Sequence, residues 1–510
     1  MLAAAPWGCE PAPPSSASAC KPLAEAPCYS GPPVASGVGA CSLGTAVCSA
    51  DGMSFGECVG SVLPSFQSCA TGVDTDCDGR AACSGAHGWS QGFLGQGDKI
   101  PRDVFVDKAG NVTIAGEFDS TADLGGGELK ADTSLMLRDI FVARYDAAGK
   151  HLWSKKLGDA ADQRLYGFAL DPSGNILLTG YSETPLEFEG EALGQAFLLK
   201  LGPDGAPLWS IEHTGELAVD GEGNILVASG FEETFTYETT TLTSAGGRDA
   251  FIAKFDPDGK FVWAISAGGA GNEYLHRIAA DGAGNITVAG QYTGVADLGG
   301  GPLPEGTNDS NQFAFLAQFE KNGAFRWSRS FVGNYVRLRH INADKTGNIF
   351  MGGDVQGPVD FGGGQGLDVI NAPFLAKIDP SGATLSVTAY EAADTDGSPL
   401  YTQLADVAFD AENNMLVLGA FAGGIDLGGG IVPKSNSYAV FIAKYDAAGK
   451  IIWGMTPGGG LALYSTGGIS ADPLGGVVVT GTYGNATDFG GGILYGHPEQ
   501  QQIFLARLAP

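Results

Sequence analysis

The chain has 510 residues with 57 acidic and 28 basic side chains, which gives a formal net charge of -29, and 80 of its residues are glycine. It is too long for one compact core, so several domains or a repeat architecture is expected. The negative charge argues against nucleic acid as a partner, and the glycine content predicts many turns and few long helices. We therefore expect a mostly β protein.

Residues 1–27 are rich in proline, alanine and serine, which predicts a flexible leader. The opening MLAAAPWGC has a short apolar patch but lacks the basic start and the apolar length of an export signal, so it is interpreted as a signal remnant. A second interpretation is a lipoprotein signal in which Cys9 carries a lipid anchor. No apolar run of about 18 residues occurs, so no transmembrane segment is expected.

All nine cysteines lie between Cys9 and Cys83. Such a short cysteine-dense segment predicts a disulfide-rich module, here residues 28–86, made in an oxidising compartment. An extracellular or cell-surface location follows. If Cys9 belongs to the leader or is lipidated, the other eight can form four bridges, whose pairing stays open because sequence does not determine connectivity.

The segment GVDTDCDGRAAC within this module is a candidate metal loop. Asp74, Asp76 and Asp78 alternate before Gly79, as do the first ligands of a calcium loop, in which the glycine makes the turn. The twelfth position would be Gly85, so the bidentate carboxylate that completes such a loop is absent.

The cysteine pattern around this loop resembles the MopE-type motif of secreted bacterial surface proteins. The matching segments are CYSGP, GVGACSLGTAVC, FGECVGSVLPS and SCATGVDTDCDG. The resemblance implies a link to copper and further acidic residues after DCDG, where this chain has Ala81, Ala82 and Cys83. Three interpretations stay open, namely a stapled turn without metal, a calcium site, and a copper site, of which the copper site lacks nearby histidines other than His87.

From residue 87 onward the chain is periodic. The turn DPSGNILLTG has six close relatives, and the aspartates that open the seven turns recur every 49 to 66 residues. They are Asp107, Asp171, Asp220, Asp281, Asp344, Asp410 and Asp472. Periods of this length indicate a propeller or another array.

Each unit repeats the same four short apolar runs. One run precedes the aspartate, a second follows the turn, a third resembles FIAKFD, and a fourth is marked by tryptophan. The tryptophans are Trp153, Trp209, Trp263, Trp327 and Trp453, with Ser386 at the equivalent place in a further unit. Four strands joined by glycine-containing hairpin turns are predicted for each unit.

Seven four-stranded units predict a seven-bladed β-propeller over residues 87–510. The array begins with GWSQGF, where Trp89 occupies the place of a fourth strand, and it ends on FLARLA, a third strand. Pairing these two segments would close the ring and remove its open edges. The units resemble the SBBP-type propeller repeat of exported bacterial proteins over about residues 88–510, a resemblance that implies the fold and no particular activity.

A second recurring element, DLGGG or DFGGG, follows the second strand in five units. It begins at Asp123, Asp297, Asp360, Asp426 and Asp488. No lysine and helix start follow it, as a phosphate loop would need, so we interpret it as a turn that lets the backbone pack closely.

Four residues before each repeat aspartate, where the innermost strand is expected to begin, lies a set of mostly polar residues. It comprises Asp103, Gly167, Glu216, Arg277, His340, Asp406 and Gly468. In a propeller this level would surround one mouth of the central channel, so Asp103, Glu216, Arg277, His340 and Asp406 are candidate ligand-binding residues.

Catalytic motifs are not found, although His276 and His340 would come from adjacent blades near this mouth. The favoured function is therefore a monomeric, non-enzymatic exported or cell-envelope protein that binds a protein, glycan or small ligand. The alternatives are a lyase or hydrolase acting at the channel mouth and a dedicated calcium- or copper-binding surface protein.

Overall fold

The computed structural model describes residues 20–29, 36–37, 40–62, 85–131, 137–238, 240–304, 313–393, 402–428, 431–458, 466–473, 475–497 and 499–509. The chain divides into two compact units, Met1–Ala82 and Cys83–Pro510. In these described ranges every regular element is a strand, and no helix that could span a membrane is found among them.

The first unit is held by disulfides around a small hairpin. Strand β1 (Glu25–Cys28) pairs antiparallel with β2 (Gly44–Val47). Disulfides join Cys20 to Cys48 and Cys28 to Cys58, and Cys41 is also disulfide-bonded. The predicted disulfides are thus present, and one of them includes Cys20 from the segment expected to be a leader.

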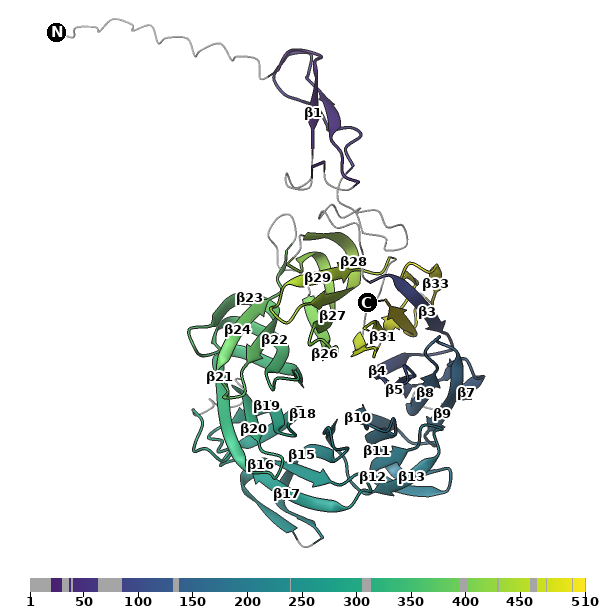
Figure 1. Ribbon diagram of the computed structural model, residues 1–510, viewed down its shortest axis with the longest axis vertical. Coiled ribbons are helices and arrows are strands. Elements are labelled where there is room, and N and C mark those ends of the chain that lie inside the picture. Colours follow the sequence, from purple (N-terminus) through teal and green to yellow (C-terminus); the bar gives the residue numbers. More distant parts are fainter. Residues whose placement is uncertain are drawn as a thin grey trace, which may run out of the picture. The chain divides into compact units, whose positions relative to one another are not determined.

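The second unit is a seven-bladed β-propeller of four-stranded antiparallel sheets, as predicted (Figure 1). Blade 1 contains β4 (Lys99–Val106), β5 (Val112–Phe118), β8 (Asp139–Tyr145) and β9 (His151–Leu157). Blade 2 contains β10 (Gln163–Leu170), β11 (Ile176–Phe188), β12 (Glu191–Leu201) and β13 (Pro207–Ile211). Blade 3 contains β14 (Glu216–Val219), β15 (Ile225–Tyr237), β16 (Thr240–Phe255) and β17 (Phe261–Ala267). The strand that precedes each repeat turn is the innermost, and the sheets surround a centre near β4, β10, β18 and β26 (Figure 1).

Blades 4 and 5 share one long strand, β21 (Phe325–Ala343), which is outermost in the first and innermost in the second. Their other strands are β18 (Asn272–Ala280), β19 (Ile286–Thr293) and β20 (Phe313–Phe319), then β22 (Ile349–Asp360), β23 (Gly366–Ile378) and β24 (Thr384–Ala389). Blade 6 contains β26 (Thr402–Phe409), β27 (Met415–Asp426), β28 (Ile431–Tyr445) and β29 (Ile451–Met455), with β25 (Ala392–Ala393) also paired to β27.

Blade 7 closes the ring by joining the two ends of the propeller. It contains β30 (Thr466–Ala471), β31 (Val477–Tyr483), β34 (Gln502–Leu508) and the early strand β3 (His87–Phe93). Strand β3 pairs antiparallel with β34, with Trp89 opposite Arg507. The predicted closure is therefore confirmed, and both edges that an open array would leave are paired.

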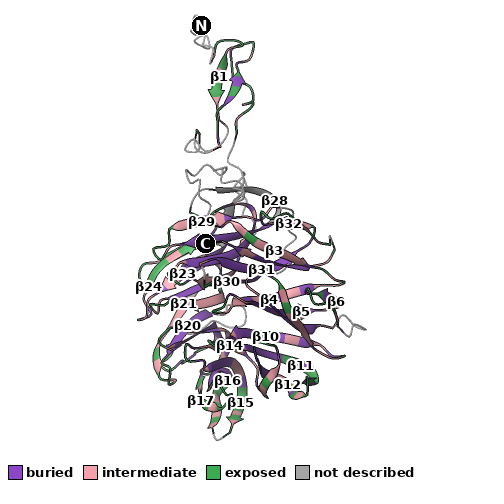
Figure 2. Ribbon diagram, turned by 45° about the vertical axis from the view of Figure 1, so that its right-hand side comes forward, coloured by how far each residue is buried: buried purple, intermediate pink, exposed green. Residues whose placement is uncertain are grey.

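Apolar side chains are buried most completely in the second and third strands of the blades. All seven residues of β31 are buried, whereas the outer strand β24 has no fully buried residue (Figure 2). Each middle strand is covered on both faces by neighbouring blades, which explains why these runs are continuously apolar rather than alternating.

The DLGGG turns pack closely, as expected. Asp297 Oδ1 accepts hydrogen bonds from the backbone N–H groups of Gly299 and Gly301 at 2.8 and 3.0 Å. A Cβ atom on Gly300 would lie 2.4 Å from the ring of Phe325 on the outer strand. The turn is thus a backbone surface against which an outer-strand ring packs. Similar turns include two short hairpins, β6 (Thr121–Asp123) with β7 (Glu128–Lys130) and β32 (Ala486–Asp488) with β33 (Ile493–Tyr495).

In every blade except blade 5, the outer strand carries a tryptophan whose ring packs on a glycine that follows that blade. The indole N–H of Trp153 donates to the carbonyl oxygen of Pro203 at 3.0 Å, and the ring packs on Gly205. Trp89, on the closing strand, donates to Ala147 O at 3.1 Å in the same way. The contact that joins ordinary neighbours therefore also fastens the closing strand.

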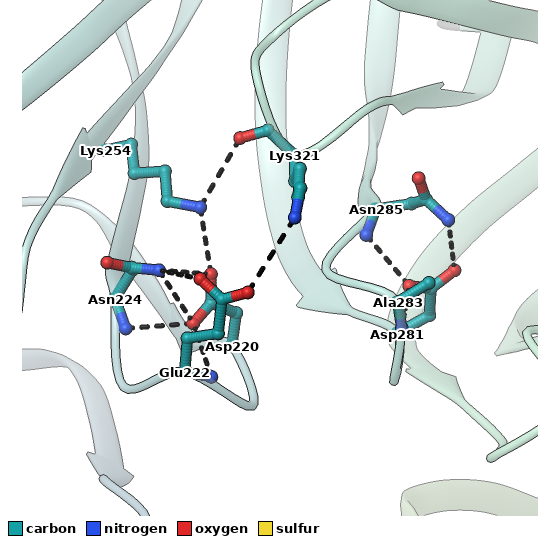
Figure 3. Close-up of polar contacts among 8 residues, drawn as sticks. All are labelled: Asp220, Glu222, Asn224, Lys254, Asp281, Ala283, Asn285 and Lys321. Carbon is teal, nitrogen blue, oxygen red and sulfur yellow. Dashed lines mark hydrogen bonds and ion pairs between the residues drawn. The ribbon is translucent and has the colours of Figure 1, made fainter.

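Buried ion pairs stabilise the repeat turns. Lys254 Nζ lies 2.9 Å from Asp220 Oδ2 and 3.4 Å from the carbonyl oxygen of Lys321 in the next blade (Figure 3). Burial alone would raise the pKa of Asp220, but hydrogen bonds from Lys254 and Asn224 hold that pKa below its ordinary value. The other pairs of this kind are Arg144–Asp107, Lys200–Asp171, Lys444–Asp410 and Arg507–Asp472.

Blades 4 and 5 lack this pair. Gln318 replaces the cation in blade 4 and donates a hydrogen bond to Thr287. The described hydrogen bonds to the Asp281 carboxylate therefore come from its own turn (Figure 3). In blade 5 Lys377 lies over the ring of Phe350 instead.

Replacing Lys254 with methionine should lower the free energy of unfolding by about 3 kcal/mol, because it leaves the buried Asp220 carboxylate without its cation. The matched change Lys377→Met removes no ion pair and should cost less than about 1 kcal/mol. Urea unfolding of both variants measures the difference. Equal losses in the two variants would contradict a stabilising role for the pair.

Candidate functional site

A cavity of about 890 Å³ lies in the channel of the propeller. The inner strands of all seven blades line it, namely β4, β10, β14, β18, the second half of β21, β26 and β30. Its size falls in the range of about 300–1,000 Å³ that is common for ligand sites. All five candidate residues, Asp103, Glu216, Arg277, His340 and Asp406, line this one cavity.

A β-bulge in the inner strands shapes the cavity. In β4, Pro101 and Asp103 pair with consecutive residues of β5, so Arg102 is the extra residue of the bulge. A Cβ atom on Gly116, opposite the bulge, would lie 2.3 Å from the carbonyl oxygen of Ile100, so only glycine fits there. The glycines at the same place in other blades are Gly180, Gly290, Gly353, Gly419 and Gly481.

Blade 3 shows what happens without this glycine. Ser229 occupies the position, and the pairing of β14 with β15 begins only at Glu216, after the place where the other inner strands have their bulge. The last glycine of the repeat NILLTG is therefore explained by the inner bulge, so this glycine is the sequence signal of the bulge.

The bulges also change the expected position of the candidate residues. They were predicted at the start of the innermost strands, which is correct only for Glu216. Asp103, Arg277, His340 and Asp406 instead lie well inside their strands, next to the bulges, because each strand begins several residues earlier. Two successive side chains thus reach the cavity from one strand, as with Arg339 and His340.

Glu216 is shared by two arginines from other blades. Its Oε1 atom lies 3.3 Å from Arg102 Nη2 and 3.1 Å from Arg277 Nη1. Arg102 also donates to the carbonyl oxygen of Tyr166, and Arg277 to that of His276 at 2.6 Å. One carboxylate therefore orients two guanidinium groups without neutralising both.

Asp103 and Asp406 approach blade 7 from its two sides. Asp406 accepts hydrogen bonds from the N–H groups of Val407 at 2.7 Å and Ile469 at 2.9 Å. A Cβ atom on Gly468 would lie 1.8 Å from Asp103 Oδ1, so no other side chain fits between the blades. Burial raises the pKa of Asp406 to about 6. Burial, and then the charge of Asp406, raises the pKa of Asp103 well above its ordinary value.

The two channel histidines do not form a pair. His340 Nδ1 lies 3.6 Å from Asp406 Oδ1, while His276 Nε2 shares a hydrogen bond with Gln291 at 3.0 Å. Burial, followed by the charges of Arg277 and other arginines, lowers the pKa of His340 well below its ordinary value. His340 is therefore neutral at physiological pH.

Sequence reasoning missed the arginines of the cavity. Four of the twelve arginines in the chain, Arg102, Arg277, Arg337 and Arg339, line it. Only Arg277 was predicted. Arg102 and Arg339 are the extra residues of inner bulges, which were not predicted, and Arg337 lies three residues before His340. The guanidinium of Arg337 makes no hydrogen bond or ion pair with the residues that the structure describes.

No group of three metal-binding side chains is found in the described part of the chain. The candidate calcium ligands Asp74, Asp76 and Asp78 lie outside the described residues.

The fold and the cavity define the class of the protein as a seven-bladed β-propeller with a charged channel. The chain is 22% identical over 459 residues to an uncharacterized WD repeat-containing protein of Acanthamoeba polyphaga mimivirus, covering 71% of this chain and 32% of that protein. The chain thus spans about a third of that relative's length. No family model matches, so neither the SBBP nor the MopE resemblance has a family assignment.

Solved structures are similar at low identity. A Dyadobacter fermentans protein of unknown function is 10% identical with a TM-score of 0.39, and the match covers 84% of this chain and 99% of that one. The propeller domain of the Trilobed protease from Pyrococcus furiosus is 9% identical with a TM-score of 0.40, covering 80% of this chain and 95% of that one.

The raised pKa of Asp406 predicts a pH dependence. Because the folded state holds this proton more tightly than the unfolded state, the free energy of unfolding should fall as pH rises from 3.8 to about 6. Carbon-13 NMR of the aspartate carboxyls should show one group titrating with a pKa of about 6, and Asp406→Asn should remove it.

The change Asp258→Asn, at an exposed turn, serves as the control and should leave that titration in place. If the titration persists in Asp406→Asn, the assignment to this carboxyl is wrong.

Proposed function

We propose that this is an exported, non-enzymatic binding protein of the cell envelope that takes a small anionic ligand, such as an acidic sugar, into the propeller channel. One observation carries the proposal. A chain with a formal net charge of -29 gathers four of its twelve arginines around one cavity. The lining is thus richer in cations than the chain as a whole, and recognition of an anion is a local explanation for that enrichment.

The four arginines of the cavity are not equally matched by carboxylates. Arg102 and Arg277 share Glu216, Arg339 is paired with Asp354, and Arg337 has no carboxylate partner in the described structure. The Asp103 and Asp406 pair retains a proton more readily than surface carboxyls do. Guanidinium groups bind carboxylates, sulfates and phosphates through paired N–H donors, which suits an acidic glycan or metabolite.

The disulfides support the proposed location. Bonded cysteines in the first unit indicate an oxidising, extracytoplasmic environment. The resemblance to SBBP-type repeats of exported bacterial proteins supports placement at the cell surface or outer envelope.

An enzyme acting in the same cavity is the second candidate. A neutral His340 lies 3.6 Å from Asp406, beside an Asp103 carboxyl whose raised pKa favours its protonated form. A proton acceptor and a proton donor in one cavity are what a lyase or hydrolase of acidic glycans would use. Turnover of a uronate polymer that His340→Ala abolishes, with binding retained, would favour this candidate over pure binding.

To test the binding proposal, D-glucuronate is titrated into the protein by calorimetry. Saturable binding near one equivalent is expected, and Arg337→Gln should weaken it at least about tenfold, since a charged hydrogen bond is lost. Because the Arg337 guanidinium makes no described contact, its loss should leave the melting temperature unchanged.

The matched control is Arg326→Gln, an exposed arginine that does not line the cavity, which should not alter the affinity. Neutral D-glucose should not bind. Equal weakening by Arg326→Gln and Arg337→Gln would reduce the effect to overall charge and contradict a channel site.

A calcium ion held by Asp74, Asp76 and Asp78 is a separate proposal for the first unit. Elemental analysis of protein made in metal-replete medium should find about one calcium per chain, and EDTA should lower the melting temperature. Asp76→Asn should remove both effects. Copper in place of calcium would point to metal capture, and no metal together with an unchanged melt would leave a disulfide-stapled turn.

A further inference from the structure

Blade 5 lacks the outer-strand tryptophan that the other blades carry. Ser386 of β24 lies opposite Lys377 of β23, in the register in which Trp263 lies opposite Lys254 in blade 3. Ser386 is exposed. The indole that elsewhere seals one blade against the next is therefore missing at the boundary between blades 5 and 6.

A cavity of about 390 Å³ occupies this boundary. Its apolar wall includes Phe350, Phe409, Met415 and Leu427. The volume lies at the lower end of the range of about 300–1,000 Å³ seen for ligand sites, so the cavity has room for a small ring.

The surface on which the indole would rest is present and uncovered. In blade 2, Gly205 is buried beneath Trp153, whose ring would lie 3.1 Å from a Cβ atom built on that glycine. The equivalent Gly449 in blade 6 is exposed, and nothing lies within 4 Å of such an atom. The turn at Gly449 therefore corresponds to the turns on which a tryptophan ring packs in other blades, but blade 5 has Ser386 in place of that tryptophan.

The polar partners of the missing ring are also in place. Trp153 donates to Pro203 O, two residues before its glycine, and the equivalent acceptor in blade 6 is Ala447 O. Among the described residues, the hydrogen bond to that oxygen is a long one of 3.5 Å from Lys377. Lys377 has no carboxylate partner in the described structure and lies 5.1 Å over the ring of Phe350. A cation and a hydrogen-bond acceptor thus border an apolar, ring-sized space.

We propose that this cavity is a binding site for an indole ring, either free or as a tryptophan side chain. The ring takes the place of the missing tryptophan on Gly449, its N–H donates to Ala447 O, and the Lys377 ammonium lies against its face. The site is separate from the channel and does not depend on the function proposed for it.

The experiment follows 5-fluoroindole by fluorine NMR as the protein is added. One saturable site is expected. Ser386→Trp supplies the missing ring, so it should abolish binding and raise the melting temperature. The matched change Leu385→Trp places the same ring at an exposed position that does not line the cavity, and it should leave binding intact.

Two further binding measurements test the proposal if Ser386→Trp folds poorly. Replacing indole by 1-methylindole removes the N–H donor and should weaken binding about tenfold. Lys377→Met should weaken it several-fold through loss of the cation–π contact. N-acetyltryptophanamide distinguishes the two sources, because binding at least as tight as that of indole points to a tryptophan side chain, and binding of indole alone points to a free small molecule.

No saturable binding of 5-fluoroindole, or equal binding by the Ser386→Trp variant and the unchanged protein, would overturn the proposal. Arg337→Gln, in the channel, should leave indole binding unchanged, so failure at one site is distinguishable from failure at the other.

Discussion

The propeller depends on the backbone pairing between β3 and β34, which joins strands more than 400 residues apart in the chain. A linear series of sheets would leave the last blade with an unpaired edge, whose N–H and C=O groups would lack partners. Closure gives every blade two neighbours, so all middle strands can be apolar on both faces. The same closing strand carries Trp89, which makes the inter-blade hydrogen bond found elsewhere in the ring.

Closure also determines where charge can be placed. Carboxylates of the repeat turns are buried, and five of them are matched by a cation from the third strand. In the channel the matching is incomplete, because inner bulges turn successive polar side chains toward one space. Groups such as Asp406 and His340 are therefore held where their charged forms are disfavoured. The structural carboxylates thus differ from the candidate binding groups, because most of the former are paired with a cation and the latter are only partly paired.

Departures from the repeat are as informative as the repeat itself. Ser229 replaces a glycine, and the inner strand of that blade begins only after the place of the bulge. Ser386 replaces a tryptophan, and a cavity opens beside a lysine without a carboxylate partner. In both cases six regular units show what the seventh position would contain, so the consequence of one substitution can be read from its neighbours.

The sequence alone determined the number of blades, the order of strands within each blade and the closure of the ring, because glycine turns, apolar runs and tryptophans recur in register and each is a local requirement. It also placed Asp103, Glu216, Arg277, His340 and Asp406 at one level of the channel, since equivalent residues of a closed ring share a height. It could not show that Arg102, Arg337 and Arg339 join them or that Asp406 is desolvated. Those properties depend on the bulges and on atoms contributed by other blades, which only the tertiary structure brings together.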